Sequence, residues 1–151
     1  MNDYGDKKSQ NFFACGLLNN GYKVWFADAD ATLQYKFRPD IFAEKNGVQY
    51  AFELKSRTIP STKFGDILIS EHKLNLFFAH PEIQYRLVFF YTDGVGFIVD
   101  PSQTHTIEEK PTKRTTYFSD QSVSMERKAI YQTSVAKKFK FNPQRIYRTC
   151  V

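Results

Sequence analysis

Residues 39–55 are PDIFAEKNGVQYAFELK. The dipeptide Asn46-Gly47 is the strongest short signal for a two-residue β-turn, because both turn positions need a positive φ. The segments on either side are rich in apolar, aromatic and β-branched residues, as strands are. We therefore predict a β-hairpin whose arms are residues 37–44 and 48–56.

The register of this hairpin determines which side chains meet. With a two-residue turn, Asp40 lies opposite Glu53, and opposed residues point to the same side of a sheet with Cβ atoms about 5 Å apart. Lys55 lies two residues beyond Glu53 and shares that side. Ile41 and Phe52 are opposed on the other side. The hairpin therefore has one apolar face and one face with two carboxylates and an amine.

Two opposed carboxylates destabilise a strand pair unless something neutralises them. A divalent cation does so, and Mg²⁺ typically takes one or two carboxylates and keeps several waters. Lys55 would then steady the attacking water or the scissile phosphate. The alternative interpretation is an ordinary solvated face, on which Lys55 is the salt-bridge partner of Asp40 and Glu53.

Pro39 adds a second observation to the same place. In the predicted register it would face Leu54 in a hydrogen-bonded pair, but proline has no N–H to donate. The Leu54 carbonyl would lose its donor and become available to a metal ion. Proline also disfavours a central strand position, so the strand is expected to bend there.

The rest of the chain predicts an α/β fold. We expect helices over residues 6–20 and 66–79, a loop over 57–65, and strands over 22–27, 85–91 and 95–99. A further helix is expected within residues 122–138. No linker is evident, so we predict a single domain over residues 1–151, with a core of about residues 6–100 and a basic extension over 101–151.

The charge is unevenly distributed. Residues 101–151 contain 10 lysines and arginines against 4 acidic residues, whereas residues 1–100 contain 11 against 12. The basic residues of the extension include Lys137, Lys138, Lys140, Arg145 and Arg148. Such a segment suits a polyanionic partner, although the same charges could simply serve solubility.

Several classes of protein are not indicated. Cys15, Cys150 and the three histidines have no zinc-type spacing, so His72, His80 and His105 are interpreted as structural or surface residues. Residues 1–10 are polar and charged, unlike a secretory signal, and no apolar run is long enough for a membrane span. We expect a cytoplasmic protein.

Pro39-Asp40 followed by Glu53-Leu54-Lys55 resembles the PD-(D/E)xK nuclease superfamily, which includes restriction endonucleases and archaeal Holliday junction resolvases. The predicted order of elements is similar to the αβββαβ core of that superfamily. The resemblance implies a restriction-endonuclease-like mixed sheet with helices on both faces. It also implies Mg²⁺, or Mn²⁺ as a substitute, held by Asp40, Glu53 and the Leu54 carbonyl, with Lys55 assisting phosphodiester hydrolysis.

One position departs from the superfamily pattern. Many members carry a glutamate on the first helix that completes the metal shell, and the matching position here is Gln10, with Asp6 one turn earlier as the other candidate. Gln10 could hold a water of the metal through its amide, or be an ordinary exposed helix residue. Asp28 and Asp30 form another carboxylate pair, but we interpret them as the end of the first strand.

The resulting expectation is a Mg²⁺-dependent endonuclease acting on DNA. Arg57 and Lys63 are expected to contact phosphates beside the cut, and Lys73 is expected to face the substrate groove. Junction resolution is an attractive subclass and would require a homodimer. The competing hypotheses are a nucleic-acid-binding or regulatory protein with an incomplete metal site, and an RNA-processing nuclease.

Overall fold

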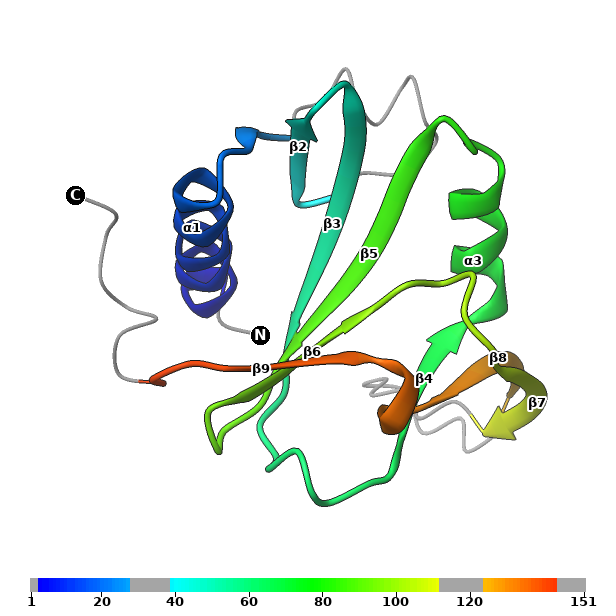
Figure 1. Ribbon diagram of the computed structural model, residues 1–151. Helices are drawn as coiled ribbons and strands as arrows, with labels where there is room; N and C mark the ends of the chain where they lie inside the picture. The colour runs from blue at the N-terminus through cyan, green and yellow to red at the C-terminus, as the bar shows by residue number, and fades with distance from the viewer. Residues whose placement is uncertain (1–2, 28–38, 112–123, 144–151) are drawn as a thin grey trace.

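The computed structural model describes residues 3–27, 39–111 and 124–143. A mixed six-stranded sheet forms the centre of the protein (Figure 1). Its strand order is β1-β2-β3-β5-β6-β9, and only β3 and β5 run parallel. The strands are Lys23–Phe26 (β1), Ile41–Lys45 (β2), Val48–Ser56 (β3), Ile83–Phe90 (β5), Val95–Val99 (β6) and Lys137–Lys140 (β9).

The predicted hairpin is present as β2 and β3. Asn46 and Gly47 have φ values of 54° and 79°, as the tight turn requires. The register runs from Lys45 opposite Val48 to Ile41 opposite Phe52, as the turn length predicts. The ladder ends there, because the Asp40 N–H donates to the Phe52 carbonyl at 3.0 Å, one residue out of register. The bend expected beside Pro39 is confirmed.

A helix covers each face of the sheet (Figure 1). The first helix, α1 (Asp3–Asn19), buries Ala14 and Leu17 against Phe52, Leu54 and other residues of one face. It ends where Gly21, at φ 85°, donates its N–H to the Leu18 carbonyl, as glycine commonly does at a helix end. The other helix, α3 (Glu71–Phe78), buries Leu74 and Phe77 on the opposite face.

The prediction of one helix over residues 66–79 is wrong in its first part. Residues Asp66–Ser70 form strand β4, and only Glu71–Phe78 is helical. Ile67 and Ile69 are buried while Asp66 and Leu68 are exposed, so the apolar residues alternate with the period of a strand. This two-residue period, together with pairing to β8, makes residues 66–70 a strand.

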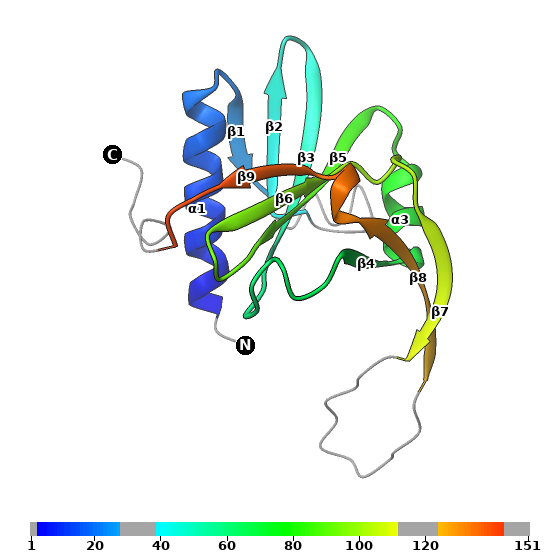
Figure 2. The same ribbon diagram turned by 60° about the horizontal axis from the view of Figure 1, so that its bottom comes forward.

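The helix predicted within residues 122–138 is also wrong, since residues 124–138 contain no α-helix. Strand β8 (Met125–Gln132) is followed by the short 3₁₀ helix η1 (Thr133–Val135), and β9 begins at Lys137. Strand β8 pairs with β4 on one side and β7 (Thr106–Pro111) on the other, forming a second, three-stranded sheet (Figure 2). Long-range pairing on both edges holds this segment extended.

Residues of the basic extension contribute to both sheets. Strands β7 and β8 belong to the three-stranded sheet, and β9 extends the central sheet beside β6. The Phe139 ring lies over Gly96, where a Cβ atom would come within 2.1 Å of the ring. The absence of a side chain at position 96 therefore lets this ring pack onto the sheet. None of the helices in the described residues has the length and apolarity needed to cross a bilayer.

Candidate functional site

The carboxylate of Asp40 is fixed at the point where α1, β2 and β3 meet. Its Oδ2 accepts a hydrogen bond from the Leu54 N–H at 2.7 Å. Its Oδ1 accepts one from Nε2 of Gln10 at 3.2 Å. Because a carboxylate can only accept, the Gln10 amide must turn its nitrogen towards Asp40. Two donors from distant segments thus orient the side chain.

Pro39 accounts for the Leu54 bond. A regular ladder would pair Leu54 with position 39, but Pro39 is buried and the strand has already left the register at Asp40. The Leu54 N–H therefore goes to the Asp40 carboxylate instead of a backbone carbonyl. The sequence predicted the bend, whereas this side-chain contact depends on how the bent strand lies.

Glu53 and Lys55 lie on the α3 side of β3, the side on which Ala51 is buried. Lys73 of α3 places its Nζ 2.6 Å from Glu53 Oε2, and the Glu53 side chain is only 15% exposed. The angles at this oxygen do not suit a hydrogen bond, so the contact is an ion pair and not a well-formed hydrogen bond. Lys55 is half-buried beside Phe89 in the parallel register with β5.

The two carboxylates therefore engage different helices. Asp40 lines a hollow of about 520 Å³ together with Gln10 and Lys7 of α1 and Ala27 at the end of β1. Glu53 instead contacts Lys73 of α3. In the described ranges no three His, Cys, Asp or Glu side chains are grouped so that they could hold a metal ion.

The donor set still suits a hard cation. Mg²⁺ needs only one or two protein carboxylates and otherwise keeps water, and it takes oxygen ligands from carbonyl groups as well. Asp40, Glu53 and the Leu54 carbonyl offer such oxygens, with Asp40 contacting α1 and Glu53 contacting α3. The site differs from a three-carboxylate centre because the α1 position is an amide.

The comparisons with known proteins bear on the fold. No protein-family model matches the sequence, and the curated proteins contain no match. Among solved structures, the chain is similar to Hjc, a Holliday junction resolvase from the archaeal hyperthermophile Archaeoglobus fulgidus. The TM-score is 0.53 at 11% identity, over 85% of this chain and 84% of that chain. The fold is restriction-endonuclease-like.

The predicted fold class is thus confirmed. As expected, the restriction-endonuclease-like sheet is mixed and has helices on both faces. The expected pairing of Asp40 opposite Glu53 is not formed, because the ladder between β2 and β3 ends at Ile41 and Phe52. At this level of identity the similarity concerns the architecture and does not test individual site residues.

Some predicted residues lie outside the described part of the structure. These are Asp28, Asp30, Arg145 and Arg148. Asp6 belongs to α1, but its side chain is not among those described. Of the two candidates on the first helix, Gln10 contacts Asp40.

Arg57 and Lys63 lie on the loop after β3 in this fold. The Arg57 guanidinium carbon lies 5.4 Å from the centre of the Phe89 ring, and Lys63 Nζ is 5.7 Å from that of Phe64. Both residues are exposed. The loop is anchored to the turn between β5 and β6, where Asp93 Oδ2 accepts hydrogen bonds from the Ser61 hydroxyl at 2.6 Å and the Ser61 N–H at 3.1 Å.

This anchor should make loop stability depend on pH. The hydrogen bond from the Ser61 hydroxyl is the main cause that lowers the pKa of Asp93 below its usual range. A lowered pKa in the folded state stabilises the protein above the unfolded pKa of about 3.9, and the effect is lost as pH falls through the folded value. We expect Ser61→Ala to lower the thermal midpoint at pH 7, with a difference that shrinks below pH 4.

The measurement is thermal unfolding of both proteins from pH 7 to pH 3. Ser102→Ala is a suitable control, because Ser102 makes similar bonds to Asp100 but lies away from this loop. A midpoint difference that stays constant across this range would contradict the role of the Asp93 charge.

Three side-chain contacts were not found by sequence reasoning. Ser9 of α1, only 3% exposed, places its Oγ 3.0 Å from that of Ser56 at the end of β3. The second is the Lys73–Glu53 ion pair, which gives Glu53 the kind of partner that the alternative interpretation had assigned to Lys55. The third is the ion pair of Arg86 and Asp100, 3.6 Å apart. The partners are far apart in sequence or on separate strands, so no local spacing in the sequence predicts these contacts.

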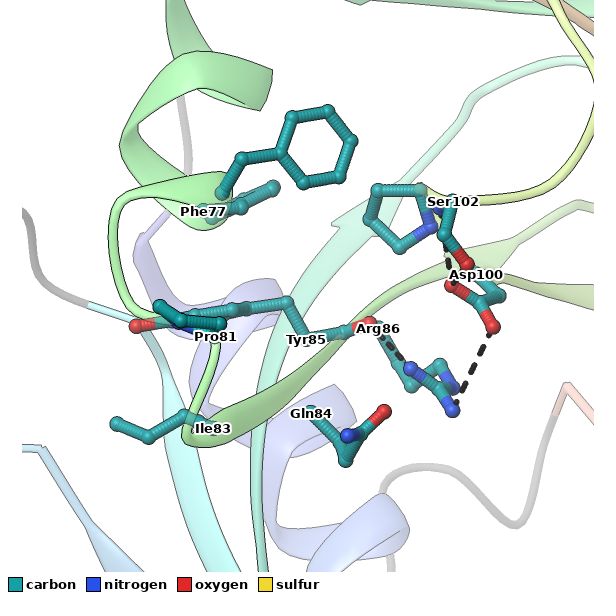
Figure 3. Close-up of a pocket in the computed structure, with 10 residues that line it drawn as sticks. Phe77, Pro81, Ile83, Gln84, Tyr85, Arg86, Asp100 and Ser102 are labelled. Atoms are coloured by element: carbon teal, nitrogen blue, oxygen red, sulfur yellow. Dashed lines mark hydrogen bonds and ion pairs between the residues drawn. The ribbon is translucent and has the colours of Figure 1, made fainter.

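Arg86 and Asp100 border a small hollow of about 170 Å³ below α3 (Figure 3). The guanidinium turns towards the Asp100 carboxylate and also donates to the Tyr85 carbonyl at 2.7 Å. Phe77, Pro81 and Tyr85 form its apolar wall. Both charged groups are used within the protein, so this hollow is not part of the candidate site.

Proposed function

We propose that the protein is a metal-dependent nuclease that hydrolyses phosphodiester bonds in DNA. The observation that carries the proposal is the orientation of Asp40 by the Leu54 N–H and the Gln10 amide at the end of the β2–β3 hairpin. The restriction-endonuclease-like fold supports it, since a protein of this architecture is a Holliday junction resolvase.

Asp40, Glu53 and the Leu54 carbonyl are the oxygens that would hold Mg²⁺ or Mn²⁺. When bound, a divalent cation would neutralise charge on the phosphate and activate a water molecule. The hydrogen bond from Gln10 holds the Asp40 carboxylate in one rotamer, so this side chain is already oriented for a metal ion. Lys73 compensates the charge of Glu53 and would have to yield part of this contact to a cation.

Lys55 is the residue we assign to the substrate phosphate. It lies on the same side of β3 as Glu53, and in the described residues its ammonium group has no hydrogen bond or ion pair with another side chain. An ammonium next to the scissile group stabilises the negative charge that develops during hydrolysis. Arg57 and Lys63, exposed on the following loop, would contact neighbouring phosphates.

The direct test is incubation with supercoiled, linear, branched and single-stranded DNA and with RNA, each with Mg²⁺, Mn²⁺ or a chelator. Nicking of supercoiled DNA that stops under chelation would support an endonuclease. Selective cutting of branched DNA would support a junction-resolving subclass, for which a homodimer should be visible by light scattering. Cutting that survives chelation would overturn the proposal.

A second candidate is a nucleic-acid-binding protein with a weak or inactive metal site. It is favoured by Gln10, a neutral amide that occupies one oxygen of Asp40 where a third carboxylate would otherwise contribute. Such a protein would bind DNA and leave it intact in the presence of Mg²⁺.

Gln10→Glu separates the two candidates. The change places a carboxylate about 3 Å from Asp40, so the metal-free protein should be less stable because the like charges repel. A divalent cation should relieve this, and Mn²⁺ affinity measured by calorimetry should rise by roughly tenfold or more, the scale on which groups around a metal alter its affinity. A weak nuclease should also cut faster.

The matched control is Gln49→Glu, the same chemical change at an exposed position near the other end of β3. Its stability should not depend on Mn²⁺. Equal Mn²⁺ affinity in the two variants would argue against a metal site at Asp40.

A further inference from the structure

A second large hollow lies on the other side of the molecule from Glu53 and Lys73. It has a volume of about 590 Å³ and opens between α1 and the sheet face that α1 covers. Its floor comes from Phe52 of β3 and Ile98 of β6, and its sides come from α1 and β9. Figures 1 and 2 both show β9 running from the sheet towards α1. We call this hollow the α1–β9 groove.

The α1–β9 groove is positively charged. Four cations from three strands line it, and no aspartate or glutamate of the described residues does: Lys45 of β2, Arg86 of β5, and Lys137 and Lys140 of β9. Lys137 and Lys140 are exposed and form no ion pair within the described ranges. Arg86 is partly compensated by Asp100 at 3.6 Å, and Lys45 donates to the Asn20 carbonyl at 2.7 Å.

Aromatic rings lie among these cations. Tyr22 and Tyr50 are half-buried, with ring centres 5.6 Å apart, and Tyr50 stacks on Phe52 at 6.1 Å. On the other side, half-buried Phe139 lies against Phe90 at 5.6 Å. Each of these rings is held by another ring, so the surfaces are pre-ordered before a ligand arrives. Pre-ordered rings bind at a lower entropic cost.

We propose that the α1–β9 groove binds a single strand of nucleic acid. Bases would stack on the rings of Tyr22, Tyr50 and Phe139, while phosphates would contact Lys137 and Lys140. Single-strand sites combine these two features, a basic groove along the backbone and aromatic platforms for the bases. An acidic peptide would satisfy the lysines but would leave the flat aromatic surfaces unused. A duplex keeps its bases stacked inside and cannot use them either.

The inference does not depend on the proposed nuclease activity. The groove lies on the α1 face, whereas Glu53 and Lys55 lie on the α3 face. The test is therefore made in chelator, where a metal-dependent enzyme cannot cut. Failure of binding here would leave the cleavage test unaffected, and failure of cleavage would leave this inference unaffected.

The experiment is fluorescence anisotropy with a labelled 15-nucleotide oligothymidylate at several salt concentrations. The variant Lys137→Glu/Lys140→Glu should bind at least tenfold more weakly, and the slope of log affinity against log salt should fall by about 1.4, as expected for two lost phosphate contacts on a single strand. Tyr50→Leu should weaken binding at least fivefold with little change in slope, because it removes a stacking surface and no charge.

Lys23→Glu/Lys138→Glu is the matched control, with the same change in net charge at two exposed lysines that do not line the groove. It should reduce affinity less than threefold. Equal losses in the two double variants would overturn the proposal, because binding would then follow overall charge. Equal affinity for a 15-base-pair duplex, or full competition by polyglutamate at equal charge concentration, would also overturn it.

Discussion

Asp40→Asn is expected to lower the rate of DNA cleavage by on the order of a thousandfold, the loss typical when an electrostatic group of an active site is removed. The amide keeps the size of the carboxylate and can still accept the Leu54 N–H bond. It removes the negative charge that a divalent cation needs. The fold should therefore survive while Mn²⁺ binding is lost, which calorimetry and circular dichroism would measure together.

Lys55→Ala should cause a similar loss of cleavage with Mn²⁺ binding retained, since Lys55 is assigned to the phosphate and not to the metal. Asp66→Asn, at an exposed position on β4, is the control for loss of one carboxylate. Cleavage by Asp40→Asn at the rate of the original protein would exclude Asp40 from the active site and leave only the fold similarity in favour of a nuclease.

Phe77→Ala is expected to have the largest effect on stability, about 3–5 kcal/mol of unfolding free energy. The Phe77 side chain is 3% exposed and stacks on Tyr85 with ring centres 4.8 Å apart. Truncation would open a cavity between α3 and β5. The neighbouring residue is a matched control, because Phe78 is 49% exposed on the same helix.

Phe78→Ala should cost less than about 1 kcal/mol, as surface substitutions usually do. Urea unfolding of both variants would give the comparison. Similar losses of unfolding free energy in the two variants would contradict the packing of α3 against β5 through Phe77.

Elements with strong local signals were predicted correctly. Asn46-Gly47 fixes the turn, and the two-residue period of strands then determines the faces of β2 and β3 as far as Ile41 and Phe52. Counted from the turn, the ladder ends one residue before Pro39, where the Asp40 N–H donates to the Phe52 carbonyl. The helix α1 and the continuous apolar strand β5 were likewise recognisable from their own residues.

The errors arose where partners are distant in the sequence. The segment 66–70 is too short for its own pattern to distinguish a strand from the start of the following helix. Its pairing partner, β8, begins about sixty residues later in the sequence. The same pairing holds Met125–Gln132 extended. Tertiary hydrogen bonding on both edges of β8 outweighs local preference, which amounts to less than 1 kcal/mol per residue.

The sequence by itself determined the hairpin and the register of its strands as far as Ile41 and Phe52, because turn chemistry and strand period act over a few residues. Only the tertiary structure decided which groups meet the two carboxylates: Gln10 at Asp40 and Lys73 at Glu53. It also brought β9 towards α1 to form the α1–β9 groove. Such contacts depend on how separate helices and strands pack, and no short-range pattern encodes that packing.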